Sequence, residues 1–345
     1  VVMSDKIRSS APEVFKYFKE QGVALKVISG DDPRTVSSIA IRAGLDNAEN
    51  YVDMTEVSEE ELPSLVEKCA VFGRVTPEKK LSIIKALKAN GHKTAMTGDG
   101  VNDVPALREA DCSVTVQAGS DAARAVSQIV LMNNDFASMP LVVQEGRRCI
   151  NNIQRSAALF LTKTIFAFLL AVAFLFLPYE YPFRPIQMTL VSALTIGAPS
   201  FLLALEPNRS LVRGSFLRNV LWKAAPGGVS AAVGIGLIMV SRAVFDFPAE
   251  EVSTMSLILM GAAFFGALFG ICLPFDKTRA VMFTALAAVF CLVPIISPTL
   301  RGFFYFEALT LREYVVIGVL IAIVWALEFL LSISSKMSKK FKKSP

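Results

Sequence analysis

The residues best suited to chemistry form a glycine-rich acidic loop from Thr97 to Asp103, with the sequence Thr-Gly-Asp-Gly-Val-Asn-Asp. Asp99, Asn102 and Asp103 place carboxylate and amide oxygens close together, and Mg²⁺ prefers a few such oxygens with several waters. The two glycines let the backbone approach a ligand closely. A lone Asp-Gly turn is common in loops, whereas seven residues in this order are far more specific. We therefore predict a Mg²⁺ site with Asp99 and Asp103 as ligands.

A second polar loop consists of Ser29, Gly30 and Asp31. The Ser29 hydroxyl and the loop amides can bond phosphate oxygens, and Lys80 can neutralise the charge on a transferring phosphoryl group. Alone, Lys80 would be interpreted as a solvated helix lysine, but the two loops together favour a role in chemistry. The predicted phosphoryl-transfer residues share polar or small side chains suited to a phosphate site: Ser29, Gly30, Asp31, Lys80, Asn102 and Asp103.

Both loops follow segments that are typical of buried strands, 24–28 and 93–97, and each loop leads into a helix. The first helix is predicted from about Pro33 to Gly44, and another begins near Pro77. Repeated strand–loop–helix units predict an α/β doubly wound parallel sheet, with ligands where the loops leave the carboxyl ends of the strands. The chain opens on the strand-like residues 1–3 without an initiator methionine or a signal peptide, so we expect it to begin inside a larger protein.

The composition changes after about residue 155, and the mean hydropathy of +0.50 is too apolar for a soluble protein of 345 residues. Six runs can cross a hydrocarbon core of about 30 Å: 157–177, 187–205, 224–245, 252–273, 280–298 and 313–333. They predict an all-α six-helix transmembrane bundle after an incomplete α/β sheet. The predicted divisions are an α/β domain at 1–140, a cytoplasmic helical stalk at 141–156, a transmembrane domain at 157–335 and a basic cytoplasmic tail at 336–345.

The distribution of basic residues predicts the orientation of these spans. The loops on the side of the soluble domain are rich in arginine and lysine, between 209 and 223 and at 277–279, and the final lysines lie on the same side. The opposite loops have few basic residues and include the acidic stretch 246–251. The positive-inside rule therefore places both termini in the cytoplasm. The formal charge of +5 is assigned to contact with a membrane surface, not with nucleic acid.

The second span is unusual because it contains Gly197 and Pro199 beside Ser192 and Thr195. Proline frees the carbonyl four residues earlier, that of Thr195, and broken helices often line transport sites. A kink satisfied by the neighbouring hydroxyls is an equally good interpretation. All four residues are candidates for a transport site.

Lys163 lies about two turns into the first span, where a charge costs roughly 2.5–3.5 kcal/mol. It is a further transport-site candidate if it faces the bundle interior or water; the alternative is a lysine that extends to the cytoplasmic interface. Arg242 and Glu328 lie nearer the ends of their spans and are expected at the interfaces. No acidic side chain is expected deep in any span.

These motifs resemble those of P-type ATPases, whose phosphorylation domain belongs to the haloacid-dehalogenase superfamily. Residues 29–31 are similar to the family's Thr-Gly-Asp segment, 77–80 to its lysine segment, and 97–107 to its hinge motif. Residues 119–124, 129–131 and 145–147 resemble the run that leads into the membrane. The resemblance is to the C-terminal half of a bacterial cation-transporting pump. It implies that Asp99 holds Mg²⁺, that Asn102 and Asp103 support the phosphate site, and that Ser29 and Lys80 contact the phosphoryl group.

Several parts of that family's pattern are missing from the 345 residues. There is no Asp-Lys-Thr-Gly-Thr, so no nucleophile is assigned in this chain, and no Thr-Gly-Glu actuator motif, nucleotide-binding domain or first four spans. A Walker A loop does not replace them, since Gly-Lys occurs nowhere. The resemblance therefore implies a plasma-membrane pump that uses ATP and Mg²⁺ only together with its missing N-terminal half.

The resemblance leaves the transported ion open. Calcium pumps of the family place an aspartate after the threonine that Thr195 matches, but here Ile196 follows, and Ser192 stands where asparagine is usual. Lys163 lies where such pumps have a liganding group. The pattern is more similar to a less-studied bacterial subgroup, with an alkaline-earth ion as the expected cargo.

Two other hypotheses remain. One is a membrane-tethered regulatory protein that binds Mg²⁺ and phosphate without turnover. The other is a membrane-anchored phosphatase, which would need an aspartate nucleophile; Asp5 is the only acid near the start, and no long apolar strand precedes it.

Overall fold

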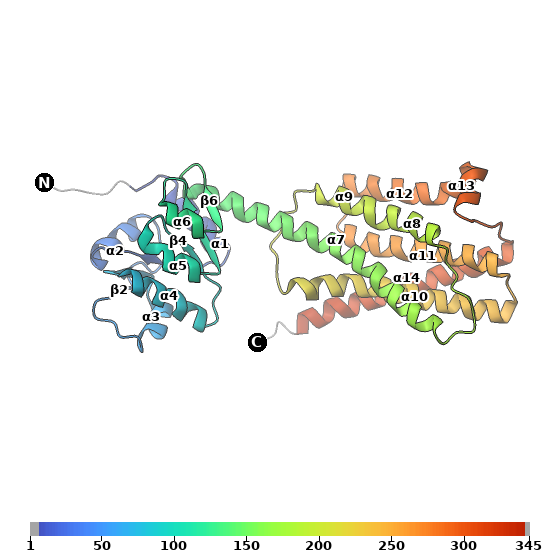
Figure 1. Cartoon of the computed structure of the whole chain (residues 1–345), viewed down its shortest axis with the longest axis horizontal. Coiled ribbons are helices and arrows are strands. Elements are labelled where there is room, and N and C mark those ends of the chain that lie inside the picture. Colours follow the sequence, from blue (N-terminus) through green and yellow to red (C-terminus); the bar gives the residue numbers. More distant parts are fainter. Residues whose placement is uncertain (1–6, 342–345) are drawn as a thin grey trace. The chain divides into compact units, whose positions relative to one another are not determined.

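The computed structural model describes residues 7–341, with side chains described through residue 334. The strand expected at residues 1–3 therefore lies outside the described residues, as do the side chains of the basic tail. The chain divides into two compact units, residues 1–144 and 145–345 (Figure 1). The first unit is built from strands and helices, and the second from helices alone.

The first unit contains short parallel strands with helices between them. Its helices are α1 (Ala11–Glu20), α2 (Pro33–Arg42), α3 (Leu62–Lys68), α4 (Pro77–Ala89), η1 (Val101–Asp103), α5 (Val104–Glu109), α6 (Asp121–Val126) and η2 (Phe136–Ser138). Its strands are β1 (Val27–Ile28), β2 (Tyr51–Asp53), β3 (Val71–Gly73), β4 (Ala95–Thr97), β5 (Cys112–Val116) and β6 (Ile129–Leu131). The predicted class, parallel strands with helices, is confirmed.

The described strands form two three-stranded sheets, with the orders β1-β3-β2 and β4-β5-β6. Every pairing is parallel; Val27 lies beside Val71, and Ala95 beside Cys112. β3 is the centre of its sheet and is fully buried, with Phe72 in an apolar cluster that includes Ile83 of α4. β1 and β4, whose ends hold the two predicted loops, are edge strands of their sheets.

Helix starts in this unit follow from local capping. α2 begins at Pro33 as predicted, and the Asp32 side chain accepts a hydrogen bond from the Arg34 amide. α4 begins at Pro77, with the Thr76 hydroxyl accepting from the amide of Lys79 at 3.4 Å. Proline at the first helical position lacks only a donor that would be unpaired anyway. Capping therefore fixes where α2 and α4 begin.

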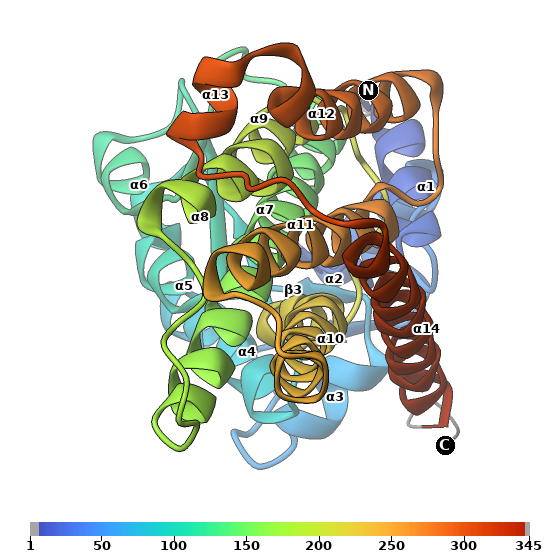
Figure 2. The same ribbon diagram turned by 90° about the vertical axis from the view of Figure 1, so that its right-hand side faces the viewer.

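The second unit contains all six predicted membrane-capable helices. They are α7 (Met139–Phe174), α8 with α9 (Pro185–Ser192 and Ala198–Ala204), α10 (Phe216–Phe245), α11 (Ala249–Cys272), α12 (Lys277–Ile296) and α14 (Leu311–Phe341); α13 (Pro298–Phe303) is a short connecting helix. α11 is the most buried of the spans, and Figure 2 shows it among the other helices of this unit.

Small residues bring these helices close together. A Cβ atom added at Gly228 of α10 would lie 2.8 Å from the carbonyl oxygen of Thr162 in α7. One added at Gly234 would lie 2.7 Å from side-chain atoms of Leu259 in α11 and of Val324 in α14. The glycines of α10 therefore let it pack closely against three neighbours, as is typical of membrane helices.

The second span is interrupted where its glycine and proline predict an interruption. Residues Ala193–Gly197 form a π-helical turn between α8 and α9, in which the Ala198 amide donates to the Ala193 carbonyl. Pro199 follows in the first turn of α9. π-helical turns inside membrane helices often occur at functional sites.

Candidate functional site

The Ser29 loop is tied to the residues that follow β3 and lead into the helix of Lys80. The Val75 amide donates to the Ser29 carbonyl at 3.0 Å, and the Arg74 amide donates to the Asp31 carbonyl at 2.8 Å. Lys80 lies one turn into α4, immediately after this connection. The carboxyl ends of β1 and β3 therefore deliver Ser29 and Lys80 to one edge of the unit, as parallel topology requires.

The Ser29 loop is compact and polar. The Ser29 hydroxyl donates to Asp31 Oδ2 at 3.1 Å, and Ser29 Oγ accepts from the Asp31 amide at 3.2 Å. Gly30 is exposed, and a Cβ atom added there would meet nothing within 4 Å. The loop therefore leaves open space beside the Gly30 amide for an anion, while Asp31 orients the serine hydroxyl.

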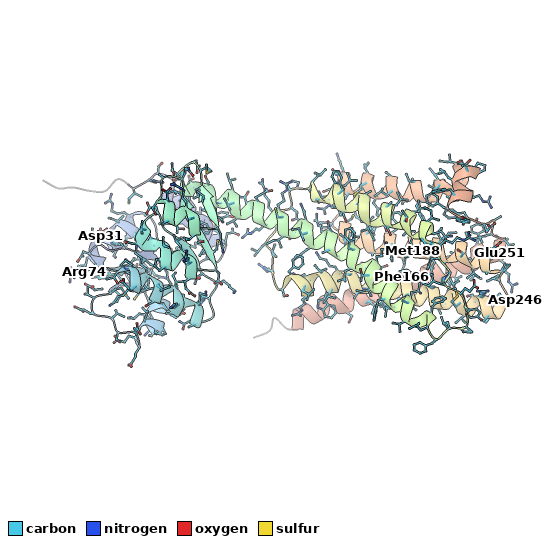
Figure 3. The ribbon with its side chains drawn as sticks, in the orientation of Figure 1. Asp31, Arg74, Phe166, Met188, Asp246 and Glu251 are labelled. Atoms are coloured by element: carbon cyan, nitrogen blue, oxygen red, sulfur yellow. The ribbon has the colours of Figure 1, made fainter. Side chains whose placement is uncertain are left out.

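Arg74 is an organising residue that the sequence analysis did not single out. Its guanidinium donates to Asp32 at 2.9 Å and to Asp53 at 2.8 Å, so it joins the start of α2 to the end of β2. Its backbone has a φ of 50°, which is uncommon for a side chain other than glycine. Hydrogen bonds from Thr55, and then the charge of Arg74, hold the pKa of Asp53 below its usual range. Figure 3 labels Arg74 and Asp31 in this unit.

Lys80 and Asp103 form the closest ion pair of the candidate site. Lys80 Nζ lies 2.6 Å from Asp103 Oδ1, and the two side chains are 17% and 10% exposed. Asp103 Oδ2 also accepts from the Gly100 amide at 3.2 Å. A Cβ atom at Gly98 would lie 2.6 Å from Cβ of Asp103. Glycine at this position is therefore needed for Asp103 to approach the loop and hold the lysine.

The side chains of Asp99 and Asn102 are exposed and, among the described residues, have no hydrogen-bond partner. Only the main chain of Asp99 is tied down, by the Ser120 amide, which donates to its carbonyl at 2.8 Å. Both oxygens of Asp103 are already engaged. Among residues 7–341, no group of three or more His, Cys, Asp or Glu side chains could hold a metal ion. A Mg²⁺ ion that takes one or two carboxylates and keeps its waters fits Asp99 better than Asp103.

The structure thus brings the predicted residues together as two pairs. Ser29 bonds Asp31, and Lys80 bonds Asp103. No hydrogen bond links one pair directly to the other within the described part of the chain. The space between them is where a phosphoryl group would need to lie.

In the membrane unit, the predicted hydroxyls bond to their own helix. Thr195 Oγ1 donates to the Val191 carbonyl at 2.7 Å, and Ser192 Oγ donates to the Met188 carbonyl at 2.6 Å. Pro199 is buried, whereas Gly197 is exposed. The hydroxyls thus satisfy local carbonyls around the π-helical turn, while the role of these residues in transport stays a prediction.

Lys163 is partly exposed, and its neighbour Thr162 occupies the buried face of α7. Thr162 Oγ1 donates to the Ala158 carbonyl at 2.9 Å and lies 3.3 Å from the Ala224 carbonyl of α10. Thr162 therefore joins the two helices at a depth where the sequence analysis considered only the lysine.

Two further polar groups of this unit were missed. Gln187 is fully buried; its side-chain oxygen accepts from the Arg184 amide at 2.9 Å, and its nitrogen lies 3.2 Å from Ser253 Oγ of α11. Glu206, beyond α9, accepts hydrogen bonds from Arg155 of α7 and Arg279 of α12. Each group joins separate helices, and the spacing of residues along the sequence does not predict such contacts.

Comparison with known proteins agrees with both units. Residues 1–111 match the haloacid dehalogenase-like hydrolase family. A probable cation-transporting ATPase, exp7, of Streptococcus pneumoniae is 39% identical over 92% of this chain and 42% of that protein. The calcium-transporting ATPase CtpE of Mycolicibacterium smegmatis is 38% identical over 82% of this chain and 37% of its own length. A calcium-transporting ATPase of Bacillus subtilis is 33% identical over 68% of this chain and 28% of its own length.

Among solved structures, the catalytic domain of the CPx-ATPase CopB-B matches at 29% identity and a TM-score of 0.31, over 39% of this chain and 46% of that chain. A score this low supports no argument about the fold.

Fold and sequence together define a haloacid dehalogenase-like hydrolase domain followed by six membrane-capable helices. The chain is a homologue of the cation-transporting P-type ATPases, and it spans about two fifths or less of the length of the curated relatives named above.

Proposed function

We propose that this chain is part of an ATP-driven cation pump, in which a phosphoryl group is passed from ATP to an aspartate outside these 345 residues and then to water. The observation that supports this proposal best is the Lys80–Asp103 pair, 2.6 Å apart and largely buried, with Lys80 on the helix that follows the segment bonded to the Ser29 loop. A lysine held this firmly near an anion-binding loop is suited to stabilise phosphoryl charge.

Each residue then has a distinct role. Ser29 Oγ and the amide of Gly30 bond the phosphoryl oxygens, and Asp31 orients the hydroxyl. Lys80 balances the charge, with Asp103 fixing its ammonium group. Asp99 is the proposed Mg²⁺ ligand, with Asn102 supporting the site, and the bound ion would neutralise charge between the phosphoryl group and the attacking carboxylate.

The test is Mg²⁺-dependent labelling by γ-labelled ATP of this chain joined to its upstream reading frame. We expect Lys80→Ala and Asp99→Asn to reduce labelling by about 100-fold or more. The matched controls are Lys85→Ala, an exposed lysine on the same helix, and Asp121→Asn, an exposed acid elsewhere in the unit. Equal labelling of Lys80→Ala and Lys85→Ala would refute the assignment. Binding of Mg²⁺ and phosphate by the joined protein without labelling would instead favour a regulatory protein without turnover.

We propose further that the bundle lies in the plasma membrane with both termini in the cytoplasm and that the cargo is an alkaline-earth ion. Two of the named relatives are calcium-transporting ATPases. The acidic residues Asp246 and Glu251 both lie at one end of the second unit (Figure 3). In intact cells, a membrane-impermeant thiol reagent should label Glu180→Cys in the first outer loop but not the native Cys149. Labelling of Cys149 alone would reverse the orientation.

A further inference from the structure

The face of α14 that packs into the bundle begins and ends with a glutamate. The buried residues of this helix share a spacing of three or four: Glu313, Ile317, Leu320, Val324 and Glu328. None is more than 8% exposed, and the spacing follows one face of an α-helix. Glu328 therefore lies on the inner face of the bundle, and its expected position near the membrane interface stays a prediction.

Small residues of two neighbouring helices make room for the Glu328 carboxyl group. A Cβ atom at Gly266 of α11 would lie 2.5 Å from Glu328 Oε2. One at Gly227 of α10 would lie 3.3 Å from Oε1 and 3.2 Å from the methyl group of Thr162 in α7. The carboxyl group therefore fills a space that a methyl group on either side would close.

This carboxyl group is not neutralised by a neighbour. Glu328 Oε2 is buried and has no hydrogen-bond partner, and no ion pair of Glu328 occurs among residues 7–334. On the helices packed against it, the nearest basic residues in sequence are Lys163, next to Thr162, and Lys223, one turn before Gly227. α11 has no charged residue after Glu251. Glu206, in contrast, meets two arginines.

We propose that Glu328 is a proton-binding site inside the helical bundle, separate from the α8–α9 interruption. An ionised carboxylate buried without a partner is costly, and a bound proton removes its charge. A calcium or magnesium ion would need about six oxygen ligands. The other side-chain atoms that lie beside the two glycines are carbons, from Thr162, Ala267 and Trp325, and the Thr162 hydroxyl is bonded to backbone carbonyls. This proposal does not depend on ATP hydrolysis.

Infrared difference spectroscopy of the full chain in lipid nanodiscs, without nucleotide, tests this proposal. At neutral pH we expect a carbonyl band of a protonated carboxylic acid that shifts in D₂O, disappears in Glu328→Gln and persists in Glu180→Gln, a change in an exposed loop. Retention of every such band in Glu328→Gln would overturn the proposal, because Glu328 would then be ionised. Loss of the band on addition of Ca²⁺ or Mg²⁺ at constant pH would also overturn it and identify a metal ligand.

A second variant, Gly266→Ala, keeps the proposal testable if Glu328→Gln does not fold. Gly266→Ala places a methyl group against Oε2 and should shift the frequency of the band without removing it. Gly270→Ala, one turn along α11 in open space, should leave the band unchanged. An identical band in both alanine variants would show that it belongs to another carboxyl group, and the proposal would fail.

Discussion

The ionic cluster around Glu206 gives a sharp prediction about stability. Arg279 donates two hydrogen bonds to the Glu206 carboxylate, at 2.8 and 2.6 Å, and Arg155 donates one at 2.6 Å. The three side chains are only 10–14% exposed. In Glu206→Gln the charge that both arginines share is lost while both guanidinium groups stay in place.

The size of the effect follows from what each arginine retains. Arg279 keeps bonds to the carbonyls of Cys272 and Pro274, but Arg155 loses its only ion pair among the described residues. Removing one partner of a buried ion pair costs about 3–5 kcal/mol of stability. Because the three side chains are slightly exposed to solvent, we expect the lower end of this range. We expect a loss of about 3 kcal/mol, which lowers the melting temperature by about 6–12 °C for a unit of this size.

Thermal unfolding of the full chain in detergent, followed by circular dichroism, measures this loss. The matched control is Glu145→Gln, which breaks an exposed pair with Arg148, 3.0 Å apart, on the same helix as Arg155. An exposed pair is worth less than about 1 kcal/mol. If Glu206→Gln is no more destabilising than Glu145→Gln, the cluster does not hold α7 to α12 and the reasoning is refuted.

Three further predictions concern other contacts. Burial acts to raise the pKa of Glu206, but the hydrogen bonds from Arg279 and Arg155 outweigh it and leave the pKa lowered. The stability that the ionised Glu206 contributes should therefore be intact at neutral pH and be lost only as the pH falls through the lowered pKa. Glu206→Gln should abolish this loss of stability in acid. Gly98→Ala should destabilise the first unit by about 1–3 kcal/mol in urea unfolding, since the added methyl group would collide with Asp103. Gln187→Leu should cost about 1–3 kcal/mol in thermal unfolding, because buried polar partners are left unpaired.

Each of these has its own control. The acid-induced loss should persist unchanged in Glu145→Gln, and equal pH profiles in all variants would exclude Glu206 as its source. Gly146→Ala, where a methyl group meets open space, should stabilise slightly; a comparable loss in both glycine variants would argue against the collision. Gln144→Leu, at a partly exposed position, should change stability by less than about 0.5 kcal/mol.

The sequence predicted the repeated and periodic parts of this molecule well. Six long apolar runs correspond to six helices, and the loops at 29–31 and 97–103 follow parallel strands because strand, loop and helix each have a strong local signal. β3, in contrast, was not predicted, since three residues are too short for a periodic pattern. Its central position in the sheet depends on pairing with β1 and β2, which are distant in sequence.

The polar contacts between elements could not be predicted for the same reason. Arg74, Gln187 and Glu206 each act through partners more than 20 residues away or on another helix. Glu328 was considered only by its distance to the end of the span, although it lies four residues after Val324 and eight after Leu320, which places it on the same face of the helix as these buried residues. A face analysis of each span would have found it.

The π-helical turn at Ala193–Gly197 also sets a rule for insertions and deletions. A π turn contains one residue more per hydrogen-bonded ring than an α turn, so removing a single residue there would restore regular α geometry. The residues beyond the turn would keep their direction, because the wider turn already takes up one extra residue. Leu203, which is buried on α9, would then stay in the core. The same deletion in a regular stretch of α-helix would rotate everything beyond it by about 100°, so this turn is where the span can lose one residue and keep its packing.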